Sequence, residues 1–192
     1  MCIAVVTRQN SVIKPEHLKR GWQTNPAGGG FAYVDKDQTV IRKGFMEYDK
    51  FEKEYLAAAE KFAGESPFLV HMRIRTSGDV SPKNTHPFPI KGGAMIHNGI
   101  MFSPSGKRAG TAKDRRSDTR VFAEDLYNIL QLDAVKKAAE GIHAAVGRGN
   151  KLCFLYDNKE IFIIGEDIGF WHEGVWYSNS GCIGYIDRSS GK

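Results

Sequence analysis

The sequence of 192 residues has few cysteines and no long hydrophobic run. Its three cysteines, Cys2, Cys153 and Cys182, form no CxxC pair and no Cys/His cluster with metal-ligand spacing, so we expect neither a disulfide framework nor a metal site. Every apolar run is shorter than the roughly 20 residues of a membrane-spanning helix. The N-terminus also lacks the basic segment and apolar core of a secretion signal. We therefore expect a cytoplasmic protein without a membrane segment, metal or cofactor.

Acidic residues are in a minority, and the formal net charge is +5. The excess of positive charge is concentrated between Lys107 and Arg116, in a stretch rich in Gly, Ser and Thr. We interpret this stretch as a solvated, exposed loop. The alternative is a contact surface for an anionic partner, such as nucleic acid or a phosphorylated acceptor.

The length predicts one domain with a hydrophobic core, residues 1–192. Hydrophobic periodicity predicts strands at residues 1–7, 31–34, 39–43, 68–73, 94–97, 100–102, 151–156, 160–164, 169–172 and 175–178. It predicts helices at residues 15–22, 48–62, 117–130 and 133–146, with Ser117 as an N-cap. Strand, helix, strands, helices and a final β-meander indicate the α+β class.

Two segments between these elements have distinct local signals. Residues 76–91 contain Gly, Asp, Asn and three prolines, and we interpret them as a long loop of the kind that forms active sites. Asn98-Gly99 lies between two short apolar runs and predicts a tight hairpin turn.

Cys2 directly follows Met1 and opens an apolar run. Removal of Met1 would leave a thiol and a free α-amine on one residue. The thiolate can attack a carbonyl while the amine, with a pKa of roughly 7.7–8.0, takes and returns the proton. The alternative is that Cys2 is a small apolar residue at the start of a buried strand.

Further polar residues lie where loops leave apolar strands. Arg73 offers a forked clamp for an α-carboxylate, and Asp118 offers a counter-charge for an α-ammonium. Asn98 and the backbone amide of Gly99 offer two donors to an oxyanion. The set suits an amino-acid-like substrate, although residue types alone do not show that the side chains converge.

Five motifs occur in order over about the first 125 residues. They are the second-position cysteine, His71-x-Arg73-x-x-Thr76-x-Gly78, Asn84-Thr85-His86-Pro87-Phe88, His97-Asn98-Gly99 and Ser117-Asp118-Thr119. With these motifs the sequence resembles the glutaminase domain of class II glutamine amidotransferases, which are N-terminal nucleophile hydrolases. The Asn84–Phe88 run is closest to the small stand-alone members.

The resemblance implies a four-layer αββα sandwich of two mainly antiparallel sheets. It also implies hydrolysis of L-glutamine to glutamate and ammonia through a γ-glutamyl thioester on Cys2. Asn98 and Gly99 would form the oxyanion hole, and Arg73 and Asp118 would bind the substrate's carboxylate and ammonium. Thr76 would belong to a loop that closes over the substrate.

The resemblance also places His86 at the substrate site, with the alternative that it only orders its loop. His71 and His97 lie in apolar strands, and we interpret both as hydrogen-bonded core histidines. Cys153 and Cys182 are expected to be inert.

The sequence departs from the family at Arg73–Gly78. Better-known synthases read Arg-Trp-Ala-Thr-His-Gly there, whereas this chain reads Arg-Ile-Arg-Thr-Ser-Gly. Loop closure and signalling to a partner domain are therefore expected to differ in detail. The 192 residues also include no segment for an ammonia acceptor, so we expect the acceptor on a separate synthetase or transferase.

Two other functions remain open on the sequence. The first is a stand-alone hydrolase of a small γ-glutamyl amide. The second is a non-catalytic basic module that binds nucleic acid, for which Cys2→Ala would be harmless and binding would be sensitive to salt.

Overall fold

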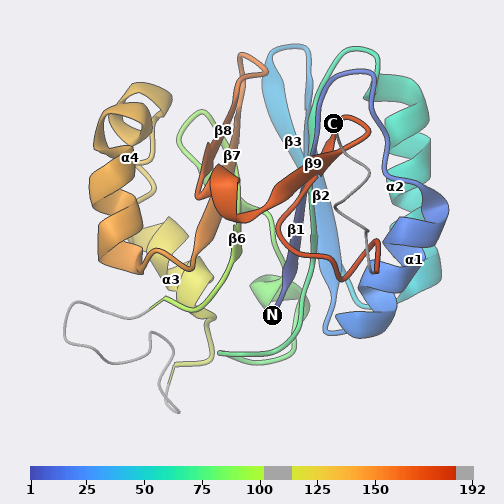
Figure 1. Ribbon diagram of the computed structural model, residues 1–192, viewed down its shortest axis with the longest axis horizontal. Helices are drawn as coiled ribbons and strands as arrows, with labels where there is room; N and C mark the ends of the chain where they lie inside the picture. The colour runs from blue at the N-terminus through green and yellow to red at the C-terminus, as the bar shows by residue number, and fades with distance from the viewer. Residues whose placement is uncertain (102–113, 185–192) are drawn as a thin grey trace.

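The computed structural model describes residues 1–101 and 114–184 (Figure 1). Its strands are β1 (Ile3–Thr7), β2 (Gly29–Asp35), β3 (Gln38–Phe45), β4 (Phe68–Met72), β5 (Phe88–Ile90), β6 (Gly93–Asn98), β7 (Lys151–Tyr156), β8 (Ile161–Ile164), β9 (Phe170–His172) and β10 (Val175–Tyr177). Its helices are α1 (Pro15–Thr24), α2 (Tyr48–Phe62), α3 (Asp118–Asp125) and α4 (Leu132–Val146), with two 3₁₀ helices, η1 (Pro82–Asn84) and η2 (Glu166–Ile168).

The strands form two sheets. One has six strands in the order β3-β2-β4-β1-β10-β9, and the other has four in the order β5-β6-β7-β8. All pairings between described strands are antiparallel. The predicted α+β class with two mainly antiparallel sheets is therefore confirmed.

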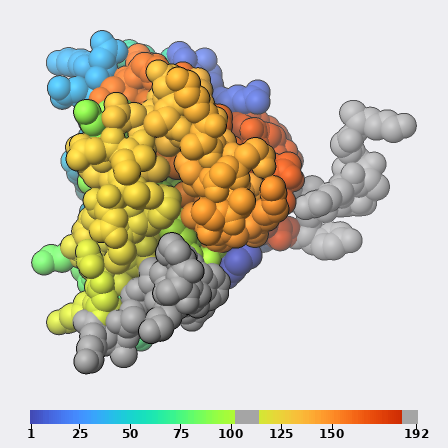
Figure 2. Space-filling model, turned by 90° about the vertical axis from the view of Figure 1, so that its left-hand side faces the viewer, coloured from blue at the N-terminus to red at the C-terminus, as the bar shows by residue number. Residues whose placement is uncertain are grey.

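The helices cover the two sheets from opposite sides, with α1 and α2 on the six-stranded sheet and α3 and α4 on the four-stranded sheet (Figure 1). Three hydrophobic clusters fill the spaces between these layers. One lies between α1, α2 and the six-stranded sheet, a second lies between the four-stranded sheet and α3 and α4, and the third lies between the two sheets. Figure 2 shows that α3 and α4 form much of the outer surface on their side.

Strand β1 illustrates why a central strand is apolar throughout. Val5 packs in the cluster under α1 and α2, whereas Val6 packs in the cluster between the sheets. Successive side chains point to opposite faces of a strand, so burial of both faces requires an unbroken apolar run. The same pattern places β4, whose five residues are all buried, at the centre of the six-stranded sheet.

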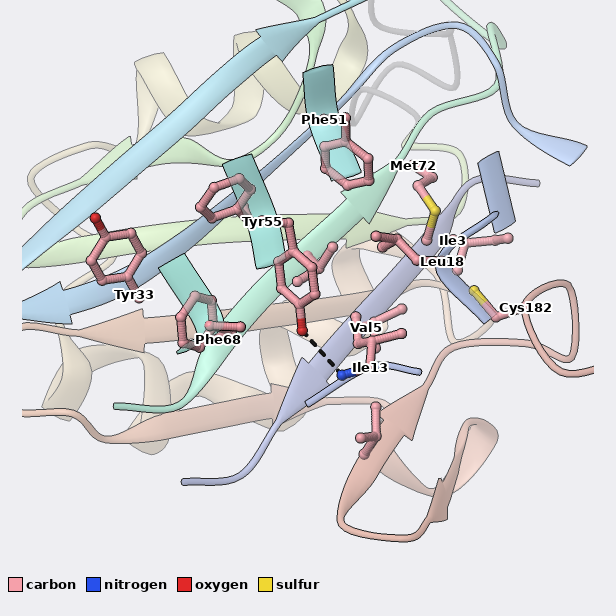
Figure 3. Close-up of a cluster of buried hydrophobic side chains, with 14 of the residues drawn as sticks. Ile3, Val5, Ile13, Leu18, Tyr33, Phe51, Tyr55, Phe68, Met72 and Cys182 are labelled. Carbon is pink, nitrogen blue, oxygen red and sulfur yellow. Dashed lines mark hydrogen bonds between the residues drawn. The ribbon is translucent and has the colours of Figure 1, made fainter. Parts of the chain in front are cut away.

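Aromatic side chains from α2 anchor that helix on the six-stranded sheet (Figure 3). Phe51 and Tyr55 are fully buried, and complete burial of such a side chain contributes roughly 1.5–3 kcal/mol to folding. The Tyr55 hydroxyl accepts a hydrogen bond from the Ile13 backbone N–H at 3.1 Å. This bond ties the segment before α1 to α2.

The hairpin predicted at Asn98-Gly99 is wrong. Ile100 and Met101 are not in a strand, and residue 102 lies outside the described residues. A type I′ turn requires positive φ at both central residues, whereas here only Gly99 has one, at 151°. Strand β6 is also paired on both sides, by β5 and β7, which leaves it no free edge.

Three further predictions need correction. The segment 76–91 contains η1 and β5, so it is not a structureless loop. The helix predicted to continue to residue 130 ends at Asp125. The last strands form no single meander, because β7 and β8 belong to the four-stranded sheet and β9 and β10 to the six-stranded one. The pairing of β10 with β1 joins opposite ends of the chain, which local sequence patterns do not record.

Candidate active site

Cys2 immediately precedes β1, and its side chain is buried. Its Sγ donates to the carbonyl oxygen of Ile74 at 3.4 Å, just beyond the neighbouring strand β4. Its own carbonyl oxygen accepts hydrogen bonds from the side-chain amides of Asn98 and Asn179. Residue 2 is therefore fixed by segments from both sheets.

The surroundings of the Cys2 thiol favour its protonated form. Burial raises the pKa of the thiol, while the positive charge of Arg73 acts in the opposite direction. A protonated thiol needs a base before it can attack a carbonyl. Met1 is 64% exposed, so an aminopeptidase could reach it and release an amine on Cys2 itself.

Arg73 follows the end of β4, and its side chain is buried. Its guanidinium donates to the carbonyl oxygens of Asp79 at 2.9 Å and Ser77 at 2.5 Å. Burial lowers the pKa of Arg73, although the negative charge of Asp118 opposes that shift. Because an arginine stays charged in proteins, it holds a positive charge beside Cys2.

Asp118 is the first residue of α3, where Ser117 caps the helix by accepting a hydrogen bond from the backbone N–H of Arg120. The predicted N-cap is therefore confirmed. Asp118 Oδ1 accepts from Ser77 Oγ at 3.0 Å, and Oδ2 accepts from the Met101 N–H at 2.9 Å. A carboxylate near a helix N-terminus is also stabilised by the helix dipole.

These side chains meet around one small cavity. Among the residues that line it are six of the predicted site residues, namely Cys2, Arg73, Thr76, His86, Gly99 and Asp118. The seventh, Asn98, is held behind them by its bond to the Cys2 carbonyl. The space left is about 10 Å³, room for about one water molecule.

The cavity is small because residues 76–80 close it. The Arg73 guanidinium donates to the carbonyl oxygens of Ser77 and Asp79, and the Asp118 carboxylate accepts from the Ser77 hydroxyl. Both charged groups are therefore already hydrogen-bonded to this segment. Gly78 has a φ of 63°, and a Cβ there would lie 2.6 Å from the backbone carbonyl carbon of Arg116. Glycine thus allows this segment to lie directly against the start of α3.

Three buried histidines lie beside the cavity. His97 bonds Thr119 Oγ1 through Nδ1 and Asn150 Oδ1 through Nε2, each at 2.8 Å. His71 stacks on His86 with ring centroids 3.8 Å apart. Burial lowers the pKa of all three, to about 3 for His71, so they are neutral at neutral pH.

The three histidines differ in how fully their ring nitrogens are hydrogen-bonded. His97 is a fully hydrogen-bonded core histidine, as predicted. His71 bonds the His97 carbonyl oxygen through Nε2 at 3.0 Å, but its Nδ1 has no partner among the described residues. His86 accepts a hydrogen bond from the backbone N–H of His97 at 3.2 Å and also lines the cavity. This position is compatible with a place at the substrate site and also with a role only in ordering its loop.

Several residues at the site were missed by sequence reasoning. Ser77, His97, Ser117 and Thr119 also line the cavity. All four lie inside the quoted motifs or next to their key residues, so the motifs could have indicated them. Asn179 follows β10 in a segment without a motif, and only the pairing of β10 with β1 brings it to Cys2.

Most of the basic segment between Lys107 and Arg116 lies outside the described residues. Of its described residues, Arg115 pairs with Asp79, and Arg116 pairs with Asp114 and Glu124. Within residues 1–101 and 114–184, no group of three or more His, Cys, Asp or Glu side chains is arranged to hold a metal ion.

No helix in the described part of the chain has the length and apolar character needed to cross a membrane.

No protein-family model matches the sequence, and no curated protein matches it either.

Proposed function

We propose that this protein is a glutaminase of the class II glutamine amidotransferase type, with Cys2 as its N-terminal nucleophile. The observation that carries the proposal is the convergence of a thiol, a guanidinium and a carboxylate on one cavity. Cys2, Arg73 and Asp118 come from three separate segments, and each is buried. The layered arrangement of helices and antiparallel sheets is compatible with the αββα fold of N-terminal nucleophile hydrolases.

The charges around the cavity match those of free glutamine. Arg73 would bind the α-carboxylate and Asp118 the α-ammonium, which directs the side-chain amide toward Cys2. At present these two groups are occupied by residues 77–79, and a cavity of about 10 Å³ is too small for an amino acid. Glutamine binding therefore requires residues 76–80 to move, with the substrate replacing their hydrogen bonds.

The chemistry follows from the Cys2 thiol and amine after Met1 has been removed. The amine takes the thiol proton, and Sγ attacks the amide carbon of glutamine. Collapse of the tetrahedral adduct breaks the C–N bond, and the amine returns the proton to the departing nitrogen, which leaves as ammonia. Water then attacks the γ-glutamyl thioester, releasing glutamate and restoring the thiol.

Two donors would stabilise the negative oxygen of the tetrahedral adduct. Asn98 Nδ2 already lies within hydrogen-bond distance of the Cys2 backbone, and Gly99 lines the same cavity. A Cβ at Gly99 would lie 2.0 Å from Asn150 Oδ1, so the backbone can occupy this position only as glycine. Donors fixed before the reaction provide the preorganised stabilisation on which such steps depend.

We also propose that the ammonia is used by a separate acceptor enzyme. The test of the whole proposal is formation of glutamate and ammonia from L-glutamine by protein shown to begin at Cys2. Turnover should disappear in Cys2→Ala and persist in Cys153→Ala, whose thiol is buried between the sheets. Absence of turnover in the wild type, or equal turnover in Cys2→Ala, would contradict the proposal. Turnover of other γ-glutamyl amides but not of glutamine would instead indicate a stand-alone hydrolase.

A further inference from the structure

A second cavity lies apart from Cys2, where β3, η1 and β5 meet α3. Its volume is about 250 Å³, and its lining includes three cationic side chains, Lys43, Lys83 and Arg120. Phe88 and Tyr127 supply aromatic surface, and Tyr127 is 42% exposed. The proposed glutaminase reaction does not use this cavity, although Phe88 is the last residue of the motif at 84–88.

Lys43 is the most unusual of the three cations. Its Nζ lies 3.9 Å from the centre of the Phe88 ring, and the residue is partly buried. Burial, assisted by the positive charge of Arg120, lowers the pKa of Lys43 to about 8. Within residues 1–101 and 114–184, no carboxylate or carbonyl oxygen accepts a hydrogen bond from this ammonium. A half-buried cation of this kind would be stabilised by an added anion.

The negative charge of Glu124 opposes the fall in the pKa of Lys43, but this carboxylate bonds to arginines rather than to either lysine. Glu124 accepts hydrogen bonds from Arg120 Nε at 2.7 Å and from Arg116 Nη1 at 2.9 Å. Two guanidinium groups therefore share it. Among the described residues, neither Lys43 nor Lys83 forms an ion pair, so the cavity carries a net positive charge.

We propose that this cavity binds a phosphate monoester that carries a flat ring, such as a nucleoside monophosphate. Lys43 and Lys83 would bind the phosphate, because its two negative charges match two ammonium groups without carboxylate partners. The ring would pack on the exposed face of Tyr127. The inference goes beyond the proposed glutaminase function and does not depend on it.

Titration calorimetry with adenosine 5′-monophosphate tests the proposal on the full chain. We expect saturable binding that weakens by about tenfold or more in Lys43→Gln and in Lys83→Gln, since each loses a hydrogen bond to a charged group. Lys61→Gln is the matched control, because Lys61 Nζ also lies over a phenylalanine ring, that of Phe62 on α2, away from the cavity. Lys83 is exposed, so Lys83→Gln leaves the fold intact. It therefore still tests the proposal if Lys43→Gln fails to fold.

Two comparisons separate the parts of the ligand. Adenosine should bind at least tenfold more weakly than the monophosphate, and Tyr127→Ala should weaken binding of the monophosphate but not of inorganic phosphate. Affinity should also fall as the pH rises through about 8, where Lys43, whose ammonium faces Arg120 and Glu124, loses its proton.

Three results would overturn the proposal. They are absence of saturable binding at millimolar monophosphate, equal affinity in the wild type and both lysine variants, and binding of a single-stranded oligonucleotide without binding of the mononucleotide. Equal affinity for inorganic phosphate and the monophosphate would overturn the assignment of the ring.

Discussion

Replacement of Arg73 by lysine keeps the positive charge beside Cys2 but removes the forked geometry. Arg73 now donates to the carbonyl oxygens of Asp79 at 2.9 Å and Ser77 at 2.5 Å, and a single ammonium cannot make both bonds in the same geometry. Loss of one hydrogen bond from a charged donor costs about 1.5–3 kcal/mol. For a chain of this size, that predicts a fall in Tm of roughly 3–12 °C in thermal unfolding followed by circular dichroism.

The same substitution should weaken glutamine binding. If Arg73 holds the α-carboxylate through two parallel bonds, Arg73→Lys should raise KM for glutamine by about tenfold to a hundredfold. Arg148→Lys is the matched control, because Arg148 is exposed and its guanidinium pairs with Glu140 on α4, away from the cavity. The same Tm and the same KM in the two variants would contradict a forked role for the Arg73 guanidinium.

Three further predictions concern the same site. Asp118→Asn places an amide where a carboxylate accepts from several donors, so KM for glutamine should rise by about tenfold or more, while Asp125→Asn at the exposed end of α3 should match the wild type. Unchanged KM in Asp118→Asn would show that the carboxylate is only structural. Gly99→Ala would put a Cβ 2.0 Å from a neighbouring side-chain oxygen, so it should lower Tm by several degrees, whereas Gly149→Ala has nothing within 4 Å and should not. Equal Tm values would contradict the packing described for that position. Burial lowers the pKa of His71 to about 3, so the unfolded chain binds a proton that the folded chain excludes. The free energy of unfolding in urea should therefore decrease as the pH falls from about 6.5 toward 3, and a constant value over that range would contradict the burial of a neutral histidine.

Strongly periodic elements could be predicted from the sequence. The helix α2 has the predicted bounds, because Phe51, Tyr55 and Ala59 recur on one face and are buried there. The strand predicted at residues 68–73 is β4, and all five of its residues are buried. In both cases a local pattern of apolar residues determines the structure.

Long-range pairing could not be predicted in the same way. Asn98-Gly99 carries a hairpin signal, yet β6 already pairs with β5 on one side and β7 on the other. After Gly99, the backbone N–H of Met101 donates to the Asp118 carboxylate instead. Asn179 reaches Cys2 only because β10 pairs with β1. The closed position of residues 76–80 depends on contacts with Arg73 and the start of α3, which no local pattern encodes.

The candidate site could be predicted in part. Its principal residues could be named because they lie in compact motifs at the ends of strands and at the start of a helix. Their convergence could not be derived from spacing, since it depends on how the two sheets and α3 come together. The cationic cavity was missed entirely, because Lys43 belongs to a hairpin strand and its neighbours Lys83 and Arg120 lie far along the chain.

The most direct test of the glutaminase proposal is the intact mass of the purified protein, before and after incubation with a diazoketone analogue of glutamine. We predict a protein without Met1 that gains one adduct, located on Cys2 by peptide mapping. The adduct should be absent in Cys2→Ala and present in Cys182→Ala, whose thiol is buried under α1. A retained Met1 with no adduct, or an adduct that persists in Cys2→Ala, would contradict Cys2 as the nucleophile.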